Sequence, residues 1–187
     1  MKAADRFIVI TGGPGSGKST LIDALRAEGF TAMPEGGRVI IQQQVVIGGT
    51  ALPWADRRAF ADLMLSWDLR SYQEAEAGTG LALFDRGVPD VVGYLDLCGL
   101  PVPPHVLRAA EHYRYRSPVF IAPPWPEIFT RDTERKQSPA EAEATYRAMV
   151  GTYSRLGYEL LELPRAPVTE RVAFVKAHLP RDHEGPE

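Results

Sequence analysis

The hydrophobic positions of this chain form two kinds of pattern, short continuous runs and longer stretches with helical spacing. The runs end at glycine, proline or charged residues, and the first of them, 7–11, is also rich in β-branched side chains, which is typical of a parallel strand buried on both faces. They lie at residues 7–11, 30–33, 81–84, 119–122 and 158–163. The pattern therefore predicts five strands.

Apolar residues three and four positions apart follow most of these runs and predict amphipathic helices. The expected helices end before Gly29, span 39–47 and 54–77, fill 88–114 in two pieces, begin at 138–141, and cover 168–179. Strands that alternate with helices predict a three-layer α/β fold with a parallel sheet. We expect one domain over residues 1–180, followed by a flexible tail at 181–187.

A glycine-rich loop lies between the first strand and the first helix. It fits the pattern G-x-x-x-x-G-K-[ST], in the strand-loop-helix context that this phosphate-binding motif requires. Its residues are Gly12, Gly13, Pro14, Gly15, Ser16, Gly17, Lys18 and Ser19. Such a loop points successive backbone N–H groups inward, and the helix N-terminus adds partial positive charge. The motif predicts that the chain binds the phosphates of ATP or GTP.

The end of this motif supplies the side chains for a bound nucleoside triphosphate. Lys18 is expected to reach the β- and γ-phosphates, and Ser19 to bind Mg²⁺ through its hydroxyl. Thr20 would lie near the α-phosphate. An ordinary glycine-rich turn with an exposed lysine is the alternative interpretation.

Two charged residues, Asp85 and Arg86, follow the third apolar run directly. Charge at the carboxyl end of a parallel strand usually indicates a site. Asp85 is placed to bind Mg²⁺, either directly or through water, and Arg86 could bind phosphoryl oxygens with its planar guanidinium. The alternatives are a turn or capping aspartate for Asp85, and a surface or aspartate-paired arginine for Arg86.

Glu35 lies at the carboxyl end of the predicted second strand. A carboxylate at this edge of the sheet can orient an acceptor hydroxyl or take its proton. An ordinary loop glutamate is the alternative. Trp54, Trp67 and Trp125 could line an acceptor pocket, but we do not count them as site residues, because isolated aromatic residues at helical spacing are more often part of the core.

The segment 130–137 is highly charged and precedes a helix that opens with a capping box at 138–141. Phosphoryl transfer needs cations near the γ-phosphate, and Arg131 and Arg135 lie in a connection of suitable length for a mobile lid. Because charge runs are usually solvated faces, a plain surface segment is the alternative.

Composition narrows the possible classes of protein. The net charge of −3, from 21 basic and 24 acidic residues, provides no global basic field for nucleic acid. Cys98 is the single cysteine, so an intramolecular disulfide is excluded. No apolar stretch is long enough to span a bilayer, and no signal core precedes the first strand. We expect a cytoplasmic protein without nucleic-acid or membrane partners, and the sequence leaves its oligomeric state open.

Several segments together resemble the small bacterial AAA-domain ATPase or kinase family that includes the ribosylnicotinamide kinase domain. More distantly, the chain is similar to deoxynucleoside kinases. The segments that carry the likeness are 8–20, 33–38, 83–87, 122–127 and 131–137. The resemblance implies a five-stranded parallel P-loop sheet in the order 2-3-1-4-5 and a helical lid.

The resemblance also implies roles for particular residues. Glu35 would contact the acceptor hydroxyl, Asp85 and Arg86 would form the acidic-basic pair that ends strand three, and Arg131 with Arg135 would cover the phosphates. The chain has Asp-Arg-Gly at 85–87 where deoxynucleoside kinases have Glu-Arg-Ser, which weakens the case for a nucleoside acceptor.

The order of these features favours a kinase that transfers the γ-phosphoryl group of Mg·ATP to the hydroxyl of a small metabolite. Two other functions stay open at this point. One is a nucleotide-hydrolysing regulatory ATPase without a small-molecule acceptor, and the other is a module that binds nucleotide without turnover.

Overall fold

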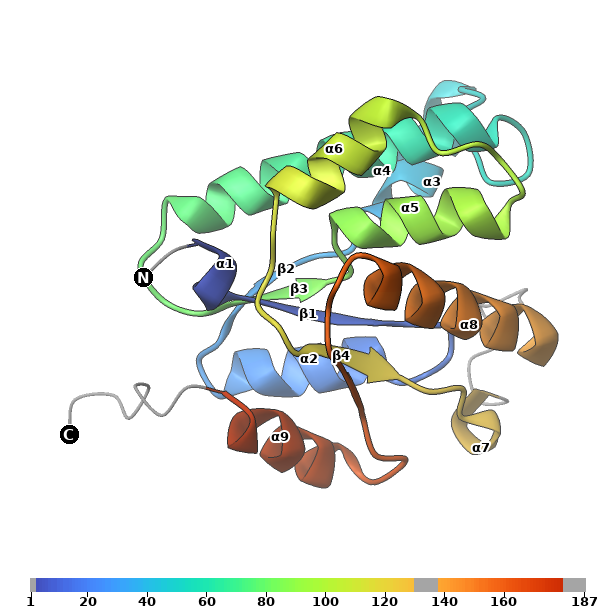
Figure 1. Cartoon of the computed structure of the whole chain (residues 1–187). Helices are drawn as coiled ribbons and strands as arrows, with labels where there is room; N and C mark the ends of the chain where they lie inside the picture. Colours follow the sequence, from blue (N-terminus) through green and yellow to red (C-terminus); the bar gives the residue numbers. More distant parts are fainter. Residues whose placement is uncertain (1–2, 130–137, 180–187) are drawn as a thin grey trace.

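A computed structural model describes residues 3–129 and 138–179 of the chain. The expected tail at 181–187 and the charged segment 130–137 lie outside the described residues. The five predicted strands are present as one parallel sheet (Figure 1). They are β1 (Phe7–Gly12), β2 (Thr31–Met33), β3 (Ala82–Asp85), β4 (Val119–Ala122) and β5 (Leu160–Glu162). Their order, β2-β3-β1-β4-β5, confirms the expected topology.

Helices connect the strands and close the fold. Those in the described residues are α1 (Ala3–Arg6), α2 (Lys18–Ala27), α3 (Gly36–Ile47), α4 (Arg57–Glu76), α5 (Val88–Leu97), α6 (Pro104–His112), α7 (Pro126–Phe129), α8 (Pro139–Arg155) and α9 (Val168–Ala177). The short helices α1 and α7 were not predicted, since one turn leaves no periodic pattern to recognise.

Local hydrogen bonds explain where two of the helices begin. The expected helix at 54–77 starts at Arg57, because the Asp56 side chain accepts a hydrogen bond of 2.9 Å from the Ala59 N–H. The capping box that opens α8 is confirmed, since Ser138 and Glu141 each accept a hydrogen bond from the other's backbone N–H.

The sheet is covered on both faces, as the continuous apolar runs predicted. Helices α2 and α9 lie on one face, and α4, α5, α6 and α8 lie on the other (Figure 1). In β1, Phe7 and Val9 pack with the second group, whereas Ile8 and Ile10 pack with the first. Alternate side chains of a strand point to opposite faces, so a strand with apolar residues at every position requires a layer on each side.

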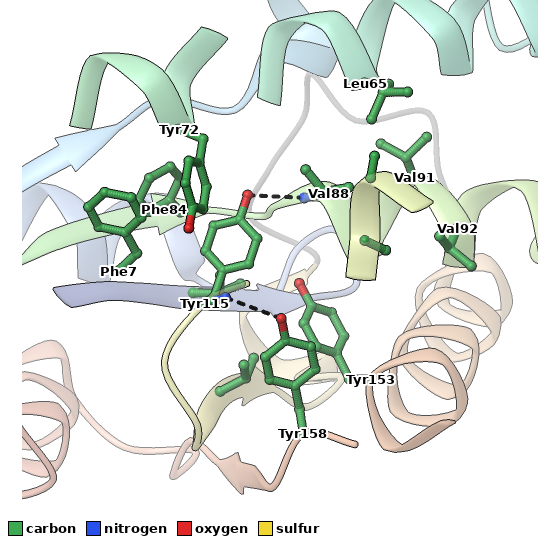
Figure 2. Packing of buried hydrophobic residues seen from close by; sticks show 14 of the residues in the cluster. Phe7, Leu65, Tyr72, Phe84, Val88, Val91, Val92, Tyr115, Tyr153 and Tyr158 are labelled. Carbon is green, nitrogen blue, oxygen red and sulfur yellow. Dashed lines mark hydrogen bonds between the residues drawn. The ribbon is translucent and has the colours of Figure 1, made fainter. Parts of the chain in front are cut away.

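An aromatic cluster fixes the start of α5, directly after the functional candidates on β3 (Figure 2). The hydroxyl of Tyr115 accepts a 3.3 Å hydrogen bond from the Val88 N–H, which has no partner inside the helix. The hydroxyl of Tyr158 accepts a 3.2 Å hydrogen bond from the Tyr115 N–H. The buried core thereby holds the segment that follows Asp85 in a defined position.

Candidate active site

The glycine-rich loop connects β1 to α2, and its polar side chains fold inward. Lys18 is the first residue of α2 and is buried, and its Nζ donates a 3.0 Å hydrogen bond to the Gly13 carbonyl. The Ser16 hydroxyl donates to the same carbonyl over 2.8 Å. The loop therefore places a lysine ammonium beside the N-terminus of α2, where the helix dipole favours an anion.

Gly17, the residue before α2, must be glycine for two reasons. Its φ is +74°, in the left-handed region that side chains disfavour. A Cβ at this position would lie 2.6 Å from Nη1 of Arg171 and 3.2 Å from Cδ1 of Ile128. The close approach of α9 and α7 thus explains this glycine of the motif.

One cavity of about 1420 Å³ brings the predicted site residues together. Those that line it are Pro14, Gly15, Gly17, Lys18, Ser19, Thr20, Glu35, Asp85 and Arg86. The remaining loop residues, Gly12, Gly13 and Ser16, are buried. Residues far apart in the sequence meet here because β2, β3 and β1 are neighbouring parallel strands whose carboxyl ends share one edge.

Asp85 is the last residue of β3 and pairs in register with Ile10 of β1. It is buried, and its Oδ1 has no hydrogen-bond partner in the described part of the chain. Burial raises the pKa of the Asp85 carboxyl, and the Lys18 ammonium acts in the opposite direction. An unsatisfied buried carboxylate oxygen is suited to a metal ion or a metal-bound water.

Arg86 has a left-handed backbone, with a φ of +70° that is uncommon outside glycine. Its Nε donates to Glu35 Oε1 over 3.0 Å, and its Nη1 donates to Asp90 Oδ1 over 3.1 Å. Burial acts to lower the pKa of Arg86, but the carboxylates of Glu35 and Asp90 raise it well above its ordinary value. Arg86 thus pairs with Asp90, as the alternative interpretation has it, and also with Glu35, so that it connects β3 to the candidate base.

Asp90 is a site residue that the sequence analysis missed. Besides Arg86, its carboxylate accepts hydrogen bonds from the Thr11 hydroxyl at 2.5 Å, the Gly87 N–H at 3.1 Å and the Tyr153 hydroxyl at 2.6 Å. Asp90 therefore ties β1, α5 and α8 to Arg86. Its place four residues after Arg86, in the first turn of a helix, was the signal that could have identified it.

Beyond Glu35, the cavity continues along one face of α4. Phe60, Met64 and Asp68 follow each other at four-residue spacing and all line the cavity. The indole N–H of Trp67 donates to the Pro34 carbonyl over 3.0 Å, which holds α4 against the segment that carries Glu35. At this end of the cavity, the α4 end, an apolar stretch of α4 therefore leads to carboxylates, and Arg57 at the start of α4 also lines the cavity.

Asp68 is the second site residue that was missed. It is half-buried, and burial together with the charges of Asp90 and Glu35 raises its pKa well above the ordinary value. No hydrogen bond or salt bridge joins Asp68 to another of the described residues. The sequence could not reveal this, because the environment of Asp68 arises only when α4 packs beside the ends of β2 and β3.

The opposite end of the cavity, the α9 end, lies on the far side of the phosphate loop. It is lined by Trp125, Ile128, residues 166–168 and Arg171. Arg171 is 3% exposed, and its Nη1 donates a 3.1 Å hydrogen bond to the Gly17 carbonyl. Nothing in the sequence distinguished Arg171 from the other charged residues of α9.

The remaining expectations have separate outcomes. Arg131 and Arg135 lie outside the described residues, so their role stays a prediction. Trp54 is 65% exposed and is not part of the core, and both Trp54 and Trp125 line the cavity. Within 3–129 and 138–179, no group of three or more histidine, cysteine, aspartate or glutamate residues could hold a metal ion by itself. Over the same residues, no helix is long and apolar enough to cross a membrane.

The order of the sheet and the phosphate loop after β1 define a P-loop kinase-like fold. A family model described as an AAA domain matches residues 7–171, and the chain belongs to this family. The resemblance seen in the sequence is thereby confirmed. No curated protein matches the chain in sequence.

Solved structures agree with this fold. The NadR protein in complex with NR is similar with a TM-score of 0.73 and 14% identity, over 94% of this chain and 52% of that one. Deoxyadenosine kinase from M. mycoides with bound dATP has a TM-score of 0.60 and 13% identity, over 92% and 97% of the two chains. The chain therefore spans about half the length of the NadR protein that it matches.

Proposed function

We propose that this protein is a kinase that transfers the γ-phosphoryl group of Mg·ATP to a hydroxyl group of a small metabolite. One observation carries the proposal: Lys18, Asp85 and Glu35 line a single cavity that continues past them along α4. A nucleotide hydrolase needs room only for water at this position, whereas a kinase needs room for an acceptor.

The donor nucleotide would bind at the phosphate loop. Lys18 would exchange its hydrogen bond to the Gly13 carbonyl for a stronger, charge-assisted contact with phosphate oxygens. The hydroxyl of Ser19 and the unpartnered Oδ1 of Asp85 fit a magnesium ion, which usually takes one or two protein ligands and keeps phosphate and water for the rest. The ion would neutralise charge on the transferring phosphoryl group.

Glu35 is proposed as the residue that orients the acceptor. Its carboxylate would accept the proton of the acceptor hydroxyl as the oxygen forms a bond to the γ-phosphorus. The bond between that phosphorus and the bridging oxygen breaks, and ADP leaves with the electron pair. The 3.0 Å contact from Arg86 holds the Glu35 carboxylate in place for this step.

The α4 end of the cavity limits the chemistry of the acceptor. Phe60 and Met64 offer apolar surface, while Asp68 and Glu35 offer hydrogen-bond acceptors at the inner end. A molecule with an apolar portion and one or more hydroxyl groups matches this order of side chains. We propose acceptors of this class as substrates.

A screen of hydroxyl-bearing metabolites with the wild-type protein and Mg·ATP tests the proposal. ADP formation is followed in each mixture, and the phosphorylated product is identified by mass spectrometry. We expect at least one acceptor to increase ADP formation with an equal amount of phosphorylated product. If ADP forms at the same rate with every acceptor and with none, the protein is a hydrolase and the proposal is wrong.

A further inference from the structure

The direction of a bound nucleotide follows from the two ends of the cavity, if the proposed function holds. The candidate base Glu35 and the Asp85 carboxylate are at the α4 end, so the γ-phosphate has to lie there. The rest of the nucleotide must then extend past Gly17 toward the α9 end. The nucleoside is therefore expected next to Trp125, Ile128 and Arg171.

Arg171 has an unusual environment for a cation. It is buried on α9, its Nε has no hydrogen-bond partner, and no carboxylate forms a salt bridge with it among the residues the structure covers. Burial lowers the pKa of its guanidinium. A buried charge without an acidic partner destabilises a fold, so its presence in a cavity wall requires another explanation.

Two contacts of Arg171 supply that explanation. Nη1 donates to the Gly17 carbonyl over 3.1 Å, and Cζ lies 5.6 Å from the centroid of the Trp125 ring. The second distance is within the range of a cation-π interaction. Arg171 thereby connects the phosphate loop to an aromatic side chain that is half-buried and lines the cavity.

The surroundings of Trp125 have the character of a base-binding surface. Ile128 and residues 166–168, which are alanine, proline and valine, are the other apolar lining residues at this end. A flat aromatic ring among aliphatic side chains binds a nucleobase by stacking, without the need for base-specific hydrogen bonds.

We propose that Trp125 stacks on the base of the bound nucleotide. Arg171 is the positioning residue that holds the Trp125 ring at a fixed position relative to the phosphate loop. The inference rests on the proposed function, because it assumes a nucleotide donor. It assigns a nucleobase as the ligand of the α9 end. It also explains how the distance between the base site and the phosphate loop is kept, since Arg171 contacts both.

Binding of two ligands that differ only in the nucleoside tests this inference. Calorimetry measures the affinity of the wild type, Trp125→Leu and Arg171→Met for Mg·ATP and for magnesium tripolyphosphate, which has no base. Trp125→Leu is expected to weaken ATP binding about tenfold, because the stacking of one base on an aromatic residue contributes about tenfold or more to affinity. Tripolyphosphate has no base, so its binding is expected to change less than about twofold. Arg171→Met is expected to lower ATP affinity at least about fivefold more than tripolyphosphate affinity.

Further variants separate positioning from general damage. Arg171→Lys keeps the cation beside the ring and should recover part of the ATP affinity. Lys176→Met, on the exposed side of the same helix, should bind both ligands as the wild type does. Melting curves establish that each variant is folded, and removal of the unpaired charge by Arg171→Met is not expected to unfold the protein.

The possible outcomes distinguish the inference from the proposed function. Equal losses of ATP and tripolyphosphate affinity in Arg171→Met would mean that Arg171 only shapes the loop through Gly17, and would overturn its role toward the base. Unchanged ATP affinity in Trp125→Leu would overturn the stacking role. A wild-type protein that binds neither ligand would instead contradict the proposed function.

Discussion

Lys18 is the side chain on which the proposed transfer depends most. It is buried beside the N-terminus of α2, and it also interacts with Asp85. Replacing it with alanine removes the ammonium that neutralises charge on the transferring phosphoryl group, so we expect Lys18→Ala to lower the turnover number by about 10²- to 10³-fold or more. Turnover is measured as ADP formation at saturating Mg·ATP. Wild-type turnover in a folded Lys18→Ala protein would contradict the role of the loop.

Asp68 allows a test of the electrostatics of the α4 end. Because its pKa is raised in the native state, the native protein holds this proton to a higher pH than the unfolded chain does. Above the ordinary pKa of about 4, the unfolded state binds fewer protons than the native state, so this group lowers stability as the pH rises. Asp68→Asn removes that penalty.

We therefore expect Asp68→Asn to have a higher Tm than the wild type at pH 8, and a smaller advantage at pH 4.5. Differential scanning calorimetry at both values gives the comparison. Glu76→Gln, an exposed position on the same helix, serves as the control and should show no such trend. A difference in Tm between Asp68→Asn and the wild type that does not change with pH would show that Asp68 carries no raised pKa.

The sequence predicted those site residues whose position depends on local structure. Glu35 and Asp85 could be placed because they lie at the carboxyl ends of strands, and these ends share one edge of a parallel sheet. The partners of Arg86 could not be chosen, because an arginine in that position can face phosphate, solvent or an acid. Asp68 and Arg171 lie in the middle of helical patterns, and only the packing of α4 and α9 brings them to the cavity.

At the scale of the elements, the packing of α5 against α8 can be tested with two glycines. A Cβ at Gly93 of α5 would lie 2.8 Å from the buried Met149 Sδ of α8, whereas a Cβ at Gly151 of α8 would meet no atom within 4 Å. Gly151→Ala is expected to stabilise the protein by about 0.5–1 kcal/mol, the usual gain in a helix interior. Gly93→Ala is expected to destabilise it by about 1–3 kcal/mol through overpacking.

Urea denaturation of both variants provides these free energies of unfolding. Equal stabilisation by the two substitutions would mean that α5 and α8 do not pack as closely as described. The pair is informative because the intrinsic helical gain of alanine over glycine is the same in both, so that only the contact differs.

The sequence predicted the helices and strands well wherever a capping residue or a long periodic pattern of apolar residues marked them. The box at Ser138 and Glu141 and the glycines after α2 and α3 set helix ends correctly. The strand expected at 158–163 is shorter, because only residues 160–162 pair with β4 at the edge of the sheet, and pairing is not visible in an apolar run. Helices of a single turn, α1 and α7, had no period to detect.

For the whole molecule, nucleotide binding should be visible as a change in stability. A ligand that binds only the native state at 100 times its dissociation constant stabilises the protein by about 2.7 kcal/mol. We expect Mg·ATP at such a concentration to raise the Tm by several degrees, as measured by differential scanning fluorimetry, and the Lys18→Ala protein to respond less. An unchanged Tm of the wild type at millimolar Mg·ATP would count against a nucleotide site.

The central claim is that the protein transfers the phosphoryl group to an acceptor hydroxyl held beside Glu35. The most direct measurement records acceptor phosphorylation and background ATP hydrolysis in the same samples, for the wild type and for Glu35→Gln. We expect Glu35→Gln to lose about 10²-fold or more in phosphorylation of the acceptor found by the screen, the usual scale for a positioned base, while hydrolysis by water falls much less. Acceptor phosphorylation at the wild-type rate in Glu35→Gln would contradict the account.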